Sequence, residues 1–255
     1  LGRRHEEEAI RSSVARHEFE LAANIQRSLL PAPQPSIQGI TATGHCESAL
    51  SIGGDFYDLI PIDERGFFFV IADVMGKGVA ASMIAAVTRS VVRSLPDNFE
   101  QPATLLNKVA RRMFDDLDRL EMFVTIAVGM VDAPTGIVCI ANAGHCPVVV
   151  TGDTCHLAPP ENPPLGIERS PEFLQYEIPF PPGARLLAYT DGFIDPRNDP
   201  QAFSDEEEVG RWFDSCNHQE AGLDALKQQL LSRLGQAETP GGLADDQTFL
   251  LLSSR

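Results

Sequence analysis

This sequence predicts an α+β fold, in which antiparallel sheets are flanked by helices and follow an N-terminal helical arm. Runs rich in β-branched and aromatic residues dominate the chain after residue 35. The helical stretches come in two pairs, 79–94 with 102–120 and 205–214 with 219–234. Paired helices favour antiparallel sheets, because a parallel sheet would need a helix between successive strands. No repeat or low-complexity linker divides the chain, so we expect an arm over residues 1–30 and one domain over residues 31–255.

Strands are predicted where apolar runs lie between turn residues. Gly66 marks the turn before one of the longest runs, and residues 132–136 and 142–145 read as turns between later strands. A proline-rich loop occupies 158–164. The predicted strands are Ile37–His45, Phe67–Ala72, Phe123–Val131, Gly136–Ala141, Pro147–Thr151, Phe173–Ile178, Arg185–Tyr189 and Gln247–Leu252.

The arm reads as one helix over residues 4–30 that ends at Pro31. A coiled coil is one interpretation, and a plain amphipathic helix packed on its own domain is the other. Polar residues in a seam weaken a coiled coil but specify its register and oligomeric state. The seam positions would be Ile10, Val14, His17, Leu21 and Asn24.

The charge of the chain limits its partners. With 20 Lys and Arg against 36 Asp and Glu, the formal net charge is −16. Nucleic acid binding needs a basic surface, and an anionic membrane would repel such a chain. No apolar run reaches the roughly 18 residues of a membrane-spanning helix, and the N-terminal residues lack the apolar core of a secretory signal. We therefore expect a cytoplasmic protein that binds neither nucleic acid nor membrane.

The five cysteines include no CxxC pair, which favours reduced thiols. A zinc site is the alternative interpretation, although the residue spacings differ from those of the usual structural sites. Its ligands would come from Cys139, Cys146, Cys155, His145 and His156.

Aspartates stand at the ends of predicted strands, where a rigid backbone can aim a side chain. Two carboxylates about 4 Å apart repel by roughly 4 kcal/mol at an effective dielectric constant near 20, so a cluster must bind protons or cations. Oxygen ligands favour Mg²⁺ or Mn²⁺. Each position alone also reads as an ordinary turn, and the glycine-flanked Lys77 could instead cradle a phosphate, although it lacks the P-loop spacing. The aspartates are Asp55, Asp58, Asp73, Asp191, Asp245 and Asp246.

Taken in order, the motifs of this chain resemble the SpoIIE/RsbU branch of the metal-dependent (PPM class) serine/threonine protein phosphatases. The resemblance runs from about residue 20 to residue 253. It is carried by IQRSLLP (25–31), GGDFYD (53–58), ADVMGKGVAASM (72–83), NAGHCP (142–147), PPLGI (163–167), YTDGFID (189–195) and DDQT (245–248).

The resemblance implies an αββα sandwich with two Mn²⁺ or Mg²⁺ ions at one end. It implies that Asp73 bridges the ions and Asp55 binds one of them. Asp191 and Asp245 would then hold the other, and Val74 would lend its backbone carbonyl. Asp246 could share or replace the role of Asp245, while Asp58 and His145 are expected to be structural.

Two departures distinguish this chain from the eukaryotic relatives. Those relatives carry an acidic residue where this chain has Gly54, and they bind phosphate with an N-terminal arginine that has no counterpart here. Both departures fit the bacterial branch and leave phosphate binding largely to the metals.

The implied function is hydrolysis of phosphoserine or phosphothreonine on a partner protein by a metal-activated water. The implied substrate is an anti-sigma-factor antagonist. An upstream sensor or receiver domain would act through the arm, which also predicts a homo-oligomer. The alternatives are a catalytically silent phosphoprotein-binding scaffold, an oligomerisation module, and a two-metal hydrolase of small phosphate esters.

Overall fold

The computed structural model describes residues 2–31, 39–64, 66–96, 100–194, 202–217, 222–234 and 243–255, with the backbone alone for 2–12. The start of the first predicted strand, the predicted break at 97–98 and the last residue of the YTDGFID motif lie outside these ranges. Among the described residues, no helix has the length and apolar character needed to cross a bilayer.

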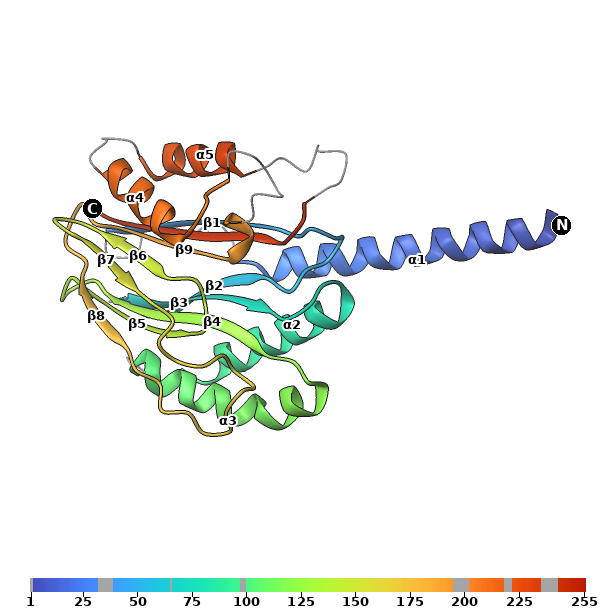
Figure 1. Cartoon of the computed structure of the whole chain (residues 1–255), viewed down its shortest axis with the longest axis horizontal. Coiled ribbons are helices and arrows are strands. Elements are labelled where there is room, and N and C mark those ends of the chain that lie inside the picture. The colour runs from blue at the N-terminus through green and yellow to red at the C-terminus, as the bar shows by residue number, and fades with distance from the viewer. Residues whose placement is uncertain are drawn as a thin grey trace.

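Two antiparallel sheets form the centre of the molecule (Figure 1). In one sheet the strand order is β1-β10-β9-β6-β7, and in the other it is β2-β3-β4-β5-β8. The first sheet contains β1 (Ile40–Glu47), β10 (Gln247–Ser254), β9 (Arg185–Tyr189), β6 (Val148–Thr151) and β7 (Cys155–Ala158). The second contains β2 (Phe56–Asp63), β3 (Gly66–Val74), β4 (Val124–Asp132), β5 (Ile137–Ala143) and β8 (Tyr176–Pro179).

Helices cover the outer face of each sheet. Helices α2 (Val79–Ser94) and α3 (Pro102–Leu120) bury their apolar sides against the β2–β8 sheet, around Phe68 and Leu106. Helices α4 (Glu206–Asn217) and α5 (Leu223–Arg233) cover the other sheet around Phe213. A third cluster, which includes Phe69 and Leu250, fills the space between the sheets. This layering confirms the predicted αββα sandwich.

The predicted elements are present, with bounds that differ by a few residues at β8, which begins at Tyr176 rather than Phe173, and at α4 and α5. Two further strands were not predicted. Helices α2 and α3 have the predicted bounds. Strand β2 was not predicted, because Asp58 and Pro61 interrupt its apolar pattern; it is an edge strand, where a proline is tolerated, and its register shifts after Pro61. Strand β7 was also not predicted, since its first residues are exposed and polar.

Helix α1 (Gly2–Leu29) projects from the sandwich over most of its length (Figure 1). Near its C-terminal end Ala23 is buried, and Leu30 packs against the cluster between the sheets. The seam residues Val14 and Leu21 are 53% and 55% exposed. The last turns of α1 therefore anchor the arm to the sandwich. The boundary between an arm over residues 1–30 and a domain over residues 31–255 stays a prediction.

Asp58 joins β2 to α2 and has the structural role expected of it. Its carboxylate is buried, with Arg93 Nη1 2.7 Å from both oxygens and Arg89 Nε 3.0 Å from Oδ2. Removing one partner of a buried ion pair leaves the other charge without compensation.

We expect Asp58→Asn to lower the free energy of unfolding by about 3 kcal/mol, measured by urea denaturation. The matched control is Asp116→Asn, which breaks an exposed pair with Arg119 on α3 and should cost less than about 0.5 kcal/mol. Equal effects of the two substitutions would contradict this role for Asp58.

Candidate metal centre

The predicted site aspartates meet at one end of the sandwich because of how the strands run. Asp55 directly precedes β2, and Asp73 lies near the end of its antiparallel neighbour β3, where Phe56 pairs with Ala72. Asp191 follows β9 and Asp245 precedes β10, and Tyr189 pairs with Phe249 in those strands. The two pairs of strand ends, one from each sheet, therefore bring together aspartates that are far apart in the sequence.

Asp55 is held by Thr190 and is almost inaccessible to solvent. The Thr190 hydroxyl donates to Asp55 Oδ2 at 2.8 Å, and it accepts a hydrogen bond from the backbone N–H of Thr248 at 3.0 Å. Burial, together with the nearby charges of Asp73 and Asp246, raises the pKa of the Asp55 carboxyl well above its usual range.

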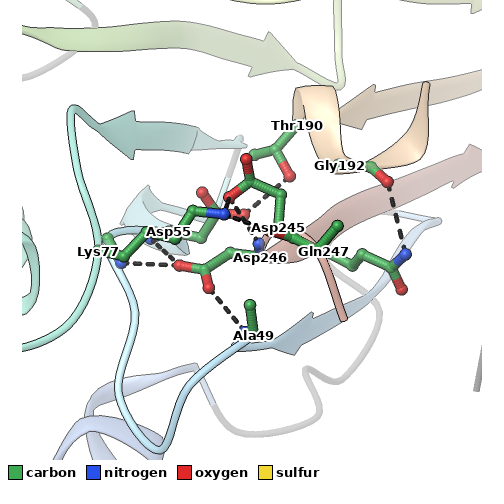
Figure 2. A network of polar contacts seen from close by, with 10 residues as sticks. Ala49, Asp55, Lys77, Thr190, Gly192, Asp245, Asp246 and Gln247 are labelled. Carbon is green, nitrogen blue, oxygen red and sulfur yellow. Dashed lines mark hydrogen bonds and ion pairs between the residues drawn. The ribbon is translucent and has the colours of Figure 1, made fainter. Parts of the chain in front are cut away.

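Asp246 organises the backbone that carries Asp55. Its Oδ1 accepts a hydrogen bond from the Ala49 N–H at 2.8 Å (Figure 2). Its Oδ2 accepts from the N–H of Gly54 at 2.8 Å and from that of Asp55 at 3.4 Å. Both oxygens thus accept hydrogen bonds from the 49–55 loop, and metal binding by Asp246 stays a prediction.

Gly54 is required by the close approach of Val74. A Cβ added at Gly54 would lie 2.7 Å from the Val74 carbonyl oxygen, so no larger residue fits there without a shift. This contact gives a physical reason for glycine at this position of the chain. It also places the Val74 carbonyl beside the loop that leads to Asp55.

Asp73 also has a carboxyl whose pKa is raised. Burial, and then the charges of Asp191 and Asp245, raise the pKa of Asp73 to about 7. Burial disfavours the charged form of a carboxyl, and nearby negative charges disfavour it further. Asp73, on β3 of one sheet, is therefore affected by the charges of Asp191 and Asp245, which adjoin strands of the other sheet.

Asp245 pairs with Lys77. The Lys77 ammonium lies 2.9 Å from Asp245 Oδ1 and also donates to the Ala244 carbonyl oxygen (Figure 2). Lys77 is flanked by Gly76 and Gly78, whose φ angles of 94° and 74° favour glycine. Its sequence context suggested a phosphate cradle, whereas its observed partners are a carboxylate and a carbonyl.

The donor set fits a hard divalent cation, although the present side-chain positions do not form a ligand cage. Among the described residues, no group of three or more His, Cys, Asp or Glu side chains stands ready to hold a metal ion. Burial nevertheless raises the pKa values of Asp55 and Asp73, and the charges of neighbouring aspartates raise them further. Oxygen ligands with unrelieved negative charge match Mg²⁺ or Mn²⁺.

The cysteines give no support to the zinc interpretation. All five are free thiols, and Cys155 is exposed while Cys139 is buried in another part of the chain. Burial raises the pKa of Cys46 to about 12, so a reactive thiolate is also disfavoured near Asp55.

His145 has the structural environment that was expected. Its Nδ1 lies 2.9 Å from Thr125 Oγ1, and its backbone N–H donates to Asn142 Oδ1 at 2.9 Å. Burial lowers the pKa of His145 to about 4, despite an opposing contribution from the Tyr189 backbone. A neutral, enclosed ring of this kind supports the turn between β5 and β6.

Sequence reasoning missed Thr190 and Gln26, and it assigned Lys77 no carboxylate partner. Thr190 adjoins Asp191 in the YTDGFID motif, which was the available signal. The Gln26 side chain reaches Gly53 across 27 positions of sequence, a contact that no local pattern predicts.

Comparison with known proteins agrees with this architecture. The chain is 25% identical over 242 residues to the phosphoserine phosphatase RsbP of Bacillus subtilis (strain 168), covering 93% of this chain and 58% of RsbP. It is 25% identical over 185 residues to the phosphoserine phosphatase RsbU of the same organism, covering 71% of this chain and 55% of RsbU. The chain therefore spans a little over half the length of these two relatives.

Two solved structures share the fold. The SiaA-PP2C domain of Pseudomonas aeruginosa superposes with a TM-score of 0.80 at 20% identity, covering 97% of this chain and 100% of that one. The PP2C phosphatase domain of SpoIIE from Bacillus subtilis, solved with a fragment of its regulatory domain, gives 0.65 at 16% identity, covering 84% and 61%. The family model described as Stage II sporulation protein E (SpoIIE) matches residues 63–255, which is most of the sequence, and the chain belongs to this family.

Proposed function

We propose that this chain is a metal-dependent phosphatase that removes phosphate from serine or threonine of a partner protein. The observation that carries the proposal is the convergence of Asp55, Asp73, Asp191 and Asp245 from two sheets on one end of the sandwich, with raised pKa values at Asp55 and Asp73. The relatives RsbP and RsbU, both named phosphoserine phosphatases, support the activity and the phosphoserine substrate.

Each residue of the site then has a distinct task. Two Mn²⁺ or Mg²⁺ ions, when bound, would supply an activated water and offset the charge of the phosphoryl group. Asp73 would be shared between the ions, Asp55 would hold one, and Asp191 and Asp245 would hold the other. The Val74 carbonyl would add a neutral oxygen ligand.

Asp246 and Thr190 act on Asp55 without binding metal in this proposal. The hydrogen bonds of Asp246 to the backbone of residues 49–55 set the path of the loop. The Thr190 hydroxyl fixes one oxygen of the Asp55 carboxylate. No covalent phosphoenzyme is required, in keeping with the raised pKa of the Cys46 thiol.

The partners of the chain follow from its relatives and its arm. We infer an anti-sigma-factor antagonist as the phosphoprotein and a sensor or receiver domain as the source of signal through α1. The exposed Val14 and Leu21 favour self-association through the arm. A cytoplasmic location fits such a role. A catalytically silent scaffold that binds phosphoproteins is the alternative.

The test is release of phosphate from phosphoserine, phosphothreonine and phosphotyrosine peptides with Mn²⁺ or Mg²⁺, with and without EDTA. We expect metal-dependent turnover of the first two peptides. Mn²⁺ binding in a calorimeter without turnover of any peptide would favour the scaffold. Absence of both binding and turnover would reject the metal centre.

Lys77 competes with a cation for Asp245, because its ammonium lies against the Oδ1 that a metal would also need. We expect Lys77→Gln to tighten Mn²⁺ binding about two- to fivefold, the range expected for loss of a half-exposed ion pair. Calorimetry measures the change, with Lys108→Gln on α3 as the control. Weaker binding in Lys77→Gln would show that Lys77 supports the site in some other way.

A further inference from the structure

Thr125 lies beside Asp73 on the neighbouring strand. The two residues are direct partners in the antiparallel pairing of β3 and β4. Directly paired residues project from the same face of a sheet. Ile71 and Ala127, the next pair on that face, pack in the cluster between the sheets. The Asp73 and Thr125 side chains therefore face the space between the two sheets, at the end where the aspartates meet.

The His145 ring lies against Thr125. Its Nδ1 is 2.9 Å from Thr125 Oγ1, and the same hydroxyl oxygen is 3.4 Å from the Asp73 carbonyl oxygen. The ring is itself held in place, since the His145 N–H donates to Asn142 Oδ1 at 2.9 Å and Asn142 Nδ2 donates to the Ala158 carbonyl oxygen at 3.1 Å. A continuous set of polar contacts thus runs from the turn between β5 and β6 to the backbone of Asp73.

His145 is a costly residue for a purely structural task. Only 2% of its surface is exposed. Its Nε2 forms no hydrogen bond within the described part of the chain, although the Tyr189 backbone lies near enough to affect the pKa of the ring. A buried polar atom without a hydrogen bond lowers stability. An apolar side chain would fill the same space without this cost, so stability alone does not account for the imidazole.

We propose that His145 is a positioning residue for Asp73 and that it acts through Thr125. The ring fixes the Thr125 hydroxyl, and Thr125 holds the end of β3 from which the Asp73 carboxylate projects. The role rests on the proposed function only where cation binding is concerned. Whether His145 orders the end of β3 is testable without a metal.

Two substitutions and their combination test this role. Thr125→Val removes the hydroxyl and keeps a β-branched side chain, while His145→Phe removes both ring nitrogens and keeps an aromatic ring. The double variant replaces both hydrogen-bonding partners with apolar groups, so neither partner is left without the other. The matched control is Thr154→Val combined with His156→Phe, an exposed pair near the start of β7 whose Oγ1 and Nε2 atoms are 2.7 Å apart.

The first readout is amide hydrogen exchange of the peptide that spans residues 72–76, in EDTA. We expect exchange about tenfold faster in both single variants and in the double variant, because the end of β3 loses its support from the turn. The second readout is Mn²⁺ affinity by calorimetry, which should fall about tenfold in all three, as for other residues that orient a metal ligand. The two single effects should not add, since both substitutions break one contact. The control should change neither readout.

Stability separates positioning from a general loss of structure. The double variant should unfold at the same urea concentration as the unsubstituted chain, or at a higher one, because it removes the unpaired Nε2. Weaker Mn²⁺ binding together with a lower urea midpoint would overturn the proposal, and so would unchanged exchange at 72–76. Faster exchange with an unaltered Mn²⁺ affinity would overturn it as well. If the unsubstituted chain binds no Mn²⁺, the proposed function fails, and exchange alone then decides whether His145 orders the end of β3.

Discussion

Asp73→Asn is expected to lower kcat/KM for a phosphoserine peptide by about 10²- to 10³-fold, the size of effect seen when one preorganised electrostatic group is lost. Asp73 is the carboxylate on which the charges of Asp191 and Asp245 act together with burial. An amide has the same shape, but it neither carries charge nor bridges cations as a carboxylate does. The measurement is initial rates in saturating Mn²⁺.

The matched control for this loss is Asp153→Asn in the exposed turn between β6 and β7. It removes the same charge far from the carboxylate cluster and should leave kcat/KM within about twofold, as expected for a surface substitution. Calorimetry on Asp73→Asn distinguishes weaker metal binding from a defect in the chemical step. Full activity in Asp73→Asn would reject the assigned site.

Most of this site was predictable because its residues lie in local motifs. Asp55, Asp73, Asp191 and Asp245 each stand at a strand end, and strand ends can be located from alternating apolar patterns. The close approach of Gly54 to Val74 was not predictable, because it depends on how β2 and β3 pair in three dimensions. The contacts of Asp246 with the 49–55 loop join residues nearly 200 positions apart for the same reason.

Strands interrupted by polar residues limited prediction of the fold. Asp58 looks like a turn residue in sequence, yet β2 accommodates it because Arg89 and Arg93 on α2 neutralise its charge. Gln26 belongs to the IQRSLLP motif, but the sequence assigned no contact to its side chain. Its contact with Gly53 depends on where α1 crosses the 49–55 loop, which is a tertiary property.

Without metal, Asp73→Asn is expected to be more stable than the unsubstituted chain by roughly 4 kcal/mol at pH 8, which follows from a pKa raised from 3.8 to about 7. A carboxyl with a raised folded-state pKa keeps its proton in the folded protein after the unfolded chain has lost it. Stability therefore falls as the pH rises from about 4 to about 7, and the loss is complete above that range. The asparagine variant has no such proton to lose.

The unfolding free energies of Asp73→Asn and of the unsubstituted chain must be compared at the same pH, because His145 changes stability with pH in the opposite direction. Its pKa of about 4 lies below that of the unfolded chain, so it destabilises the folded state as the pH falls from 6.5 towards 4. That contribution is common to both proteins and cancels in their difference. The difference in unfolding free energy in EDTA should grow from near zero at pH 4 to its full value at pH 8.

Mn²⁺ should reverse the order of stability at pH 8, because the cation relieves the same repulsion that the asparagine removes and binds the unsubstituted chain more tightly. The proton and the metal would then be two alternative means of neutralising one carboxylate cluster. A difference that stays constant from pH 4 to pH 8 would show that Asp73 is not repelled by its neighbours. In that case the cluster would have no electrostatic need for a cation, and the physical basis for placing the metals there would be lost.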